Sequence, residues 1–261
     1  MTNPFNDNQI EKTLSEIVKN LEYRWGLTLV SFLPADIKNE IHQIQVRLSN
    51  LCTDQNDPGL RGGRTTFSFY NFENCHCTHF TITRSDPKGP VRKKAIVKND
   101  RSLIELLHIM KQATANIGPM TIEMNRICLS RDMLGIVLTG HCKDEQSIEY
   151  RCKLLNELNK SLPEVLNVYT RSWDRDPAQF SKIHCAIAYI KRPPPNEFSA
   201  FQQQINQIEF NPIQFTIKDI DIVHHSRRSL AFPQEGRVTF RLGRKFLAID
   251  EMEFIHRLNL S

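Results

Sequence analysis

Two strand-like stretches, each with a single histidine, constrain this chain more than any other feature. The first covers residues 77–83 and the second covers residues 183–189. Because side chains alternate between the two faces of a strand, the first stretch turns Phe80 and Ile82 one way and His79 the other, beside two hydroxyls. Those hydroxyls belong to Thr81 and Thr83. If the two stretches lie close in the fold, their histidines can act on one ligand.

The chemistry open to such a pair is proton transfer. An imidazole has an unperturbed pKa of about 6.5, so both of its forms exist near neutral pH. A neutral imidazole can accept a proton from an attacking water or hydroxyl, and an imidazolium can donate one to the departing oxygen of a phosphodiester. A neighbouring threonine hydroxyl can hold a phosphate oxygen. We therefore expect His79 and His184 to be the proton-transfer pair and Thr81 to be a phosphate ligand, without a metal or cofactor.

The pattern resembles the two-histidine (2H) phosphoesterase superfamily, the relatives of bacterial RNA 2′,3′-cyclic phosphodiesterase, which was long called 2′-5′ RNA ligase. That family carries His-x-Thr or His-x-Ser twice, each time on an apolar strand. Here the motifs are His79-Phe80-Thr81 and His184-Cys185-Ala186. The resemblance implies an α+β, two-lobed fold in which antiparallel sheets are flanked by helices around a central cleft. It also implies hydrolysis of 2′,3′-cyclic phosphates or 2′-5′ linkages, with RNA, an oligonucleotide or a cyclic nucleotide as substrate.

The second motif departs from the family pattern, because Ala186 stands where a hydroxyl residue is expected. The loss of one such donor commonly costs on the order of 10²–10³ in rate when no neighbour compensates. Four other residues are candidates to hold the phosphate instead. These are Thr83, Tyr189, Arg192 and His225. The alternative interpretation is a catalytically weak RNA- or nucleotide-binding protein on the same fold.

Apolar spacing and turn residues predict an irregular succession of helices and strands. Helices are predicted over 10–24, 37–51, 101–115, 147–158 and 197–208. Strands are predicted over 27–32, 65–70, 77–83, 121–129, 133–139, 183–189, 215–223 and 237–242. Strict strand–helix–strand repetition is absent, and so are a glycine-rich dinucleotide fingerprint and a P-loop, which favours α+β over a doubly wound sheet. We expect a helical extension over 1–26 and a bilobal domain over 27–261.

Composition bounds the remaining possibilities. The seven cysteines are an odd number, the amino terminus lacks a signal-peptide pattern, and no apolar run could span a bilayer, so a cytoplasmic protein with free thiols is expected. The net charge of +5 favours anionic ligands, and the basic segment 88–98 could attract phosphate. A third interpretation is a zinc-stabilised interaction module that uses Cys75 and Cys77, with His79 and His184 as the further zinc ligands, although this spacing matches no common structural zinc pattern. We expect His224 and His225 to begin a solvated loop.

Overall fold

The computed structural model describes residues 26–51, 66–84, 101–130, 135–166, 176–192, 198–225, 236–243 and 251–258. The described strands are β1 (Gly26–Phe32), β2 (Thr66–Phe69), β3 (His76–Arg84), β4 (Met120–Leu129), β5 (Gly135–Cys142), β6 (Lys182–Arg192), β7 (Ile213–Ile217), β8 (Asp219–His225) and β9 (Gly236–Arg241). The described helices are α2 (Lys38–Leu51), α3 (Ser102–Ala115), α4 (Glu145–Val165), α6 (Phe198–Asn206) and α7 (Glu251–Leu258). Short 3₁₀ turns are η1 (Ala35–Ile37), η3 (Phe72–Asn74) and η5 (Pro177–Gln179). The predicted helix over 10–24 and the basic segment 88–98 lie outside the described residues.

The described strands form one sheet in the order β7-β4-β5-β6-β3-β1-β8-β9, with β2 also paired to β6. Every pairing within it is antiparallel, which confirms the predicted α+β class. The sheet has two halves, which meet where β3 lies beside β6. The register joins these two strands through one residue pair, Cys77 opposite Cys185. The two strands predicted to carry the histidines are therefore neighbours at the middle of the sheet.

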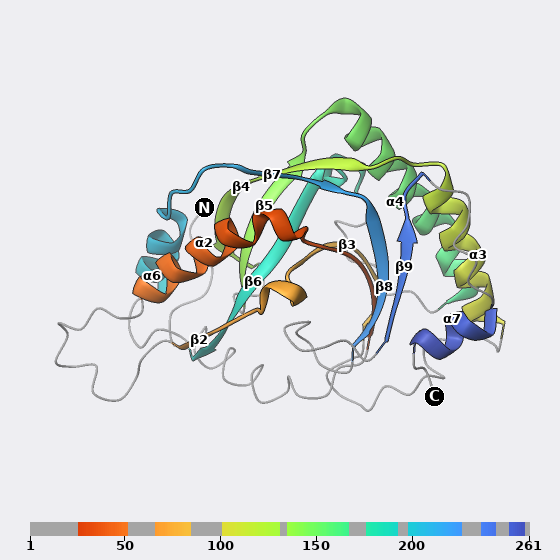
Figure 1. Cartoon of the computed structure of the whole chain (residues 1–261), viewed down its shortest axis with the longest axis horizontal. Helices are drawn as coiled ribbons and strands as arrows, with labels where there is room; N and C mark the ends of the chain where they lie inside the picture. Colours follow the sequence, from red (N-terminus) through yellow and green to blue (C-terminus); the bar gives the residue numbers. More distant parts are fainter. Residues whose placement is uncertain are drawn as a thin grey trace.

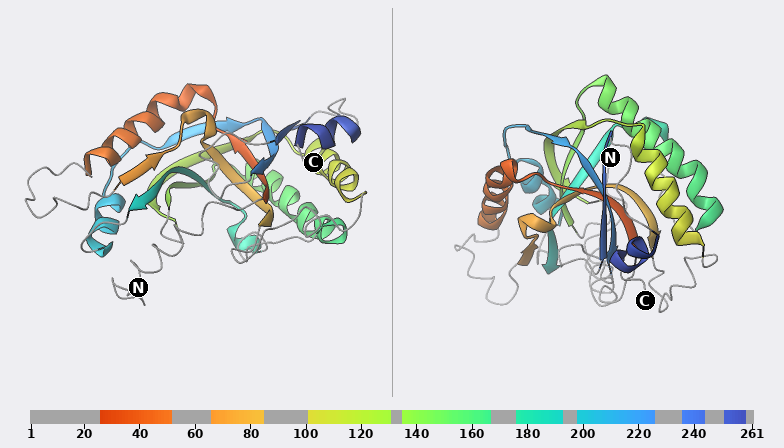
Figure 2. Two further views of the ribbon diagram at one scale, coloured as in Figure 1. Left: turned by 90° about the horizontal axis from the view of Figure 1, so that it is seen from below. Right: turned by 45° about the vertical axis from the view of Figure 1, so that its right-hand side comes forward.

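Helices flank the curled sheet towards both of its ends (Figures 1 and 2). Helices α2 and α6 lie together towards one end, and α3, α4 and α7 lie together towards the other. Each helix faces the sheet with an apolar stripe, such as Leu154, Leu155 and Leu158 of α4, all of which are buried in the hydrophobic core. Within the described residues, none of the helices combines the length and the apolar character that crossing a membrane requires.

The predicted strand over 215–223 is wrong as a single element. It divides at Lys218 into β7, which pairs with β4, and β8, which pairs with β1 in the other half of the sheet. The division follows from the phase of the apolar residues, because Phe215 and Ile217 are buried before Lys218, whereas Ile220 and Ile222 are buried after it. One residue thus links strands from the two halves, which requires the sheet to curl (Figure 1).

Most other predicted elements are confirmed to within a few residues, with α4 extending further than expected. His224 is a second exception. It is buried within β8, and its ring Nδ1 lies 3.0 Å from the carbonyl oxygen of Leu258 in α7. The predicted loop at 224–225 is therefore wrong, since this histidine attaches the carboxyl-terminal described helix to the sheet.

Candidate active site on strands β3 and β6

The two faces of the sheet are defined at the contact between β3 and β6. Cys77 lies directly opposite Cys185, and both side chains are 0% exposed within the hydrophobic core. Directly opposite residues of an antiparallel pair turn their side chains to the same face. We call the face that carries these two cysteines the core face. Their immediate neighbours along the strands turn to the other side, which we call the second face.

Four residues around this contact share the second face: His76 and Thr78 of β3, and His184 and Ala186 of β6. Extended by one residue in each direction along the antiparallel strands, the pair of Cys77 and Cys185 sets Thr78 opposite His184 and His76 opposite Ala186. His76 and His184 are therefore diagonal neighbours, a relation that places residues about 7–8 Å apart across a strand pair. The row continues into β5, where the half-buried Thr139 lies opposite His184. Two imidazoles and two hydroxyls are thus gathered on one face.

His79 occupies a different position, because β3 contains a bulge. In the register with β1, Leu29 lies opposite Phe80 and Val30 lies opposite Thr78, so His79 is an extra residue between them. A bulge interrupts the alternation of side chains along a strand. The prediction that His79 lies on the face opposite Phe80 is therefore wrong. The His79 side chain instead contacts the buried residues Ser31 and Arg151.

The contacts of His79 fix its protonation state. Its side chain is buried at 1% exposure, with Nδ1 2.5 Å from Nη1 of Arg151 in α4 and Nε2 2.8 Å from Oγ of Ser31 in β1. An arginine can only donate, so Nδ1 accepts and Nε2 carries the proton that is donated to Ser31. Ser31 in turn donates to the carbonyl oxygen of Asp219 at 2.6 Å. Burial, followed by the charges of Arg151, His184 and His76, holds the pKa of His79 well below its ordinary value. His79 is therefore a neutral residue whose one lone pair is already bound.

The two halves of the sheet repeat this local structure. In β6, Ile136 lies opposite Ala188 and Val137 lies opposite Ala186, so that Ile187 is the extra residue of an equivalent bulge. Ile187 follows His184 by three positions, just as His79 follows His76. The counterpart of His184 is thus His76, and the counterpart of His79 is a buried isoleucine.

The sequence also contains a copy of the motif that the prediction did not use. Residues 76–81 read His-Cys-Thr-His-Phe-Thr, which contains His-x-Thr twice in succession. The prediction falls on the second copy, although only the first, His76-Cys77-Thr78, shares its central cysteine with His184-Cys185-Ala186. That shared cysteine is the signal that could have distinguished the two copies.

His76 has the hydrogen bonding of a proton acceptor. Its Nδ1 lies 2.7 Å from the carbonyl oxygen of Asn74, and because a carbonyl only accepts, Nδ1 carries the proton and Nε2 carries the lone pair. The ring lies edge-to-face with Phe32 at 5.9 Å between centroids. Burial lowers the pKa of His76 to about 4, against the opposing effect of the hydrogen bond to Asn74. The neutral, accepting form is therefore present at pH 7.

Two of the other predicted site residues lie along the strands away from this pair. Thr81 lies opposite Thr28, about 10 Å along β3 from Thr78. Tyr189 lies about 16 Å along β6 from His184 and packs edge-to-face against Tyr70. Three further predicted residues belong to strands by their backbone, and their side chains lie outside the described part. These are Thr83 in β3, Arg192 in β6 and His225 in β8.

The cysteines of the zinc hypothesis lie on the core face. A hydrogen bond to Cys185 and then burial raise the pKa of Cys75, which favours the protonated thiol over the thiolate that binds zinc. Within the described part of the chain, no group of three or more histidine, cysteine, aspartate or glutamate side chains is placed to hold a metal ion. The described residues therefore do not fit the predicted zinc module.

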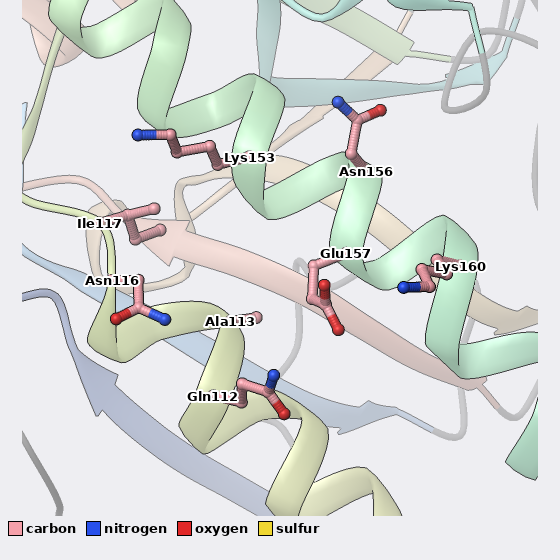
Figure 3. A pocket seen from close by; sticks show the side chains of 8 residues that line it. All are labelled: Gln112, Ala113, Asn116, Ile117, Lys153, Asn156, Glu157 and Lys160. Atoms are coloured by element: carbon pink, nitrogen blue, oxygen red, sulfur yellow. The ribbon is translucent and has the colours of Figure 1, made fainter.

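A groove lies in the helical layer between α3 and α4 (Figure 3). Polar and charged side chains dominate its lining. The lining residues are Gln112, Ala113, Asn116, Ile117, Lys153, Asn156, Glu157 and Lys160. None of the site residues predicted from the sequence is among them.

No family model matches the chain, and no curated protein matches it either. Similar solved structures include Usb1 from Kluyveromyces marxianus, with 12% identity and a TM-score of 0.48 over 85% of this chain and 99% of that one. TT0787 from Thermus thermophilus has 13% identity and a TM-score of 0.45 over 83% of this chain and 94% of that one. E. coli LigT in complex with 3′-AMP has 11% identity and a TM-score of 0.45 over 84% of this chain and 95% of that one. Each of these is a solved structure to which this chain is similar at 13% identity or less.

Proposed function

We propose that this protein is a phosphodiesterase that hydrolyses a 2′,3′-cyclic phosphate or a 2′-5′ linkage in RNA or an oligonucleotide. His76 and His184 are the proton-transfer pair, and Thr78 is a phosphate ligand. One observation carries the proposal: the pairing of Cys77 with Cys185 sets these three side chains on one face, at the junction of the two halves of the sheet. His76 takes the place that the sequence motif assigned to His79.

The reaction can be written from these groups. Nε2 of His76 accepts a proton from the attacking water while the water oxygen bonds to phosphorus. The bond from phosphorus to the leaving oxygen breaks, and protonated His184 donates a proton to that oxygen. The hydroxyl of Thr78, directly opposite His184, donates a hydrogen bond to a non-bridging phosphate oxygen, where negative charge accumulates. This scheme uses only side chains of β3 and β6 and requires no metal.

The test is a hydrolysis assay with 2′,3′-cyclic nucleotides and short 2′-5′ oligomers, with a chelator present. We expect His76→Gln and His184→Gln each to lower kcat by about 10²–10⁴-fold, the usual contribution of a positioned acid or base. His108→Gln is the matched control, because His108 is exposed on α3 and pairs there with Glu251. It should leave activity unchanged.

His79→Gln decides between the two motif copies. If His79 is a structural residue, this variant should keep its activity per folded molecule even where it melts at a lower temperature. If His79→Gln loses activity while His76→Gln remains active, the catalytic histidine of β3 is His79 and not His76.

A second candidate function follows from Ala186. It lies opposite His76, at the position where Thr78 lies opposite His184, so one half of the site offers no hydroxyl from its motif. A protein that binds RNA or nucleotides with little turnover would have this feature. Binding of a nucleoside 3′-monophosphate by wild-type protein that hydrolyses none of the substrates would support this alternative.

A further inference from the structure

A buried carboxylate on the second face of the sheet has no role in the scheme above. Asp221 of β8 is 1% exposed and lies opposite Val30 of β1. A buried carboxylate costs several kcal/mol of desolvation unless partners compensate for it. Two side chains of β9 bind the same oxygen of Asp221: Nε of Arg237 at 2.7 Å and Oγ1 of Thr239 at 2.5 Å. Packing alone does not account for a carboxylate that is buried at this position and bound by two polar side chains.

The interaction with Asp221 holds Arg237 in a defined position. The guanidinium carbon also lies 4.2 Å from the centroid of the Phe32 ring, so that the cation is stacked as well as paired. The Arg237 side chain nevertheless remains 44% exposed. Since Nε serves Asp221, the two terminal nitrogens carry four further N–H groups in a rigid fork, the geometry that binds phosphate oxygens in pairs.

Phe32 connects this arginine to the catalytic pair. Its ring contacts the guanidinium of Arg237, and it also packs edge-to-face against the imidazole of His76 at 5.9 Å. Arg237 of β9, Phe32 of β1 and His76 of β3 therefore contact one another in succession, with β8 between β9 and β1 in the sheet. One aromatic ring thus separates the guanidinium from the imidazole.

On the basis of the function proposed above, we propose that Arg237 binds a phosphate group adjacent to the scissile one, and that the substrate is an oligonucleotide rather than a cyclic mononucleotide. A cyclic mononucleotide has a single phosphate, which His76, Thr78 and His184 engage. An oligonucleotide carries a further phosphate one nucleotide away, within reach of a cation that is displaced from the dyad by one ring. Asp221 is then a positioning residue, since it fixes the direction of the guanidinium.

The experiment compares two substrates that differ by one nucleotide and therefore by one phosphate: adenosine 2′,3′-cyclic phosphate and a diadenosine with a terminal 2′,3′-cyclic phosphate. We expect wild-type protein to prefer the dinucleotide. In Arg237→Gln the ratio of the two kcat/KM values should fall about 10- to 100-fold, the loss typical of a hydrogen bond to a charged group. The change should appear mainly in KM for the dinucleotide.

Arg241→Gln is the matched control. Arg241 lies on the same strand, and its Nη1 is 2.6 Å from the carboxylate of Asp219, but that partner is half-exposed. The substrate ratio of this variant should equal that of the wild type.

Arg237→Gln leaves Asp221 buried without its cation, so the protein could lose stability. The double variant Arg237→Gln/Asp221→Asn removes both charges with little change of shape, and we expect it to restore the melting temperature but not the preference for the dinucleotide. Arg237→Lys keeps the charge but not the fork, and we expect it to recover only part of the preference.

Two outcomes separate this inference from the proposed function. If wild type, Arg237→Gln and the double variant show equal substrate ratios, the phosphate subsite is wrong. Hydrolysis by the wild type would in that case still support the proposed phosphodiesterase activity. If wild-type protein hydrolyses neither substrate, calorimetry with a 5′-phosphorylated linear diadenosine and its dephosphorylated form tests the subsite alone. Affinity that depends on Arg237 would support it, and equal binding of both ligands by wild type and Arg237→Gln would overturn it.

Discussion

The methyl group of Ala186 lies across the strand pair from His76, whereas the hydroxyl of Thr78 lies across from His184. We therefore expect Ala186→Thr, at a half-buried position, to raise kcat for a 2′,3′-cyclic nucleotide on the order of tenfold or more, because it adds a donor beside the developing charge. Thr78→Val should lower kcat by about 10²–10³-fold for the same reason. Steady-state kinetics on both variants checks this pair. Unchanged kcat in Ala186→Thr and in Thr78→Val would show that neither position contacts the phosphate.

At this scale, the sequence predicts residue types better than their directions. His184 could be placed on its strand correctly because alternation holds up to Ala186. The direction of the His79 side chain could not be predicted because a bulge is a property of two paired strands, and neither the extra residue nor its partner strand is visible in 77–83 alone. The role of Arg237 was equally hidden, since it depends on Phe32 and Asp221, which are remote in sequence.

Helix α4 is attached to the middle of the sheet through Arg151. This buried side chain donates to the carbonyl oxygens of Phe180 and Lys182 and to the imidazole of His79. We expect Arg151→Met to destabilise the protein by roughly 3 kcal/mol or more, because two buried acceptors and one partly buried acceptor lose their donor. Lys153→Met is the matched control on the same helix, where the side chain is exposed and pairs with Glu149. Chemical denaturation of both variants measures the difference, and equal midpoints would contradict this role.

Elements with regular apolar spacing could be predicted, and those whose limits depend on distant partners could not. Helix α3 and strand β4 agree with their predicted limits to within one residue because their burial follows a helical or an alternating period. The boundary at Lys218 was missed, because β7 and β8 are both apolar and differ only in phase. The burial of His224 within β8 involves a contact with Leu258, which is remote in sequence, so the residues around His224 do not predict it.

The whole molecule should lose stability in mild acid. Burial lowers the pKa of His76 to about 4 and that of His79 well below its ordinary value. The unfolded chain binds protons at these groups near pH 6.5, whereas the folded chain does not, so the folded state is favoured above that pH and loses this advantage as the pH falls towards 4. The shift at His76 alone corresponds to roughly 3 kcal/mol.

Urea unfolding of wild type and His76→Gln at pH 7 and at pH 4.5 measures this effect. We expect the wild type to lose more free energy of unfolding between these pH values than the variant, which lacks one of the two depressed groups. A pH dependence that is identical in the two proteins would show that His76 is not buried in its neutral form.

The single residue between β7 and β8 limits how the two halves of the sheet can move. The link is reinforced where the amide of Leu242 donates to the carbonyl oxygen of Lys218 at 2.9 Å. A one-residue connection is too short to lengthen. The two halves of the sheet therefore cannot move apart at that end unless backbone hydrogen bonds between the strands break first. Exchange of substrate and product is therefore expected to proceed without hinge opening at Lys218.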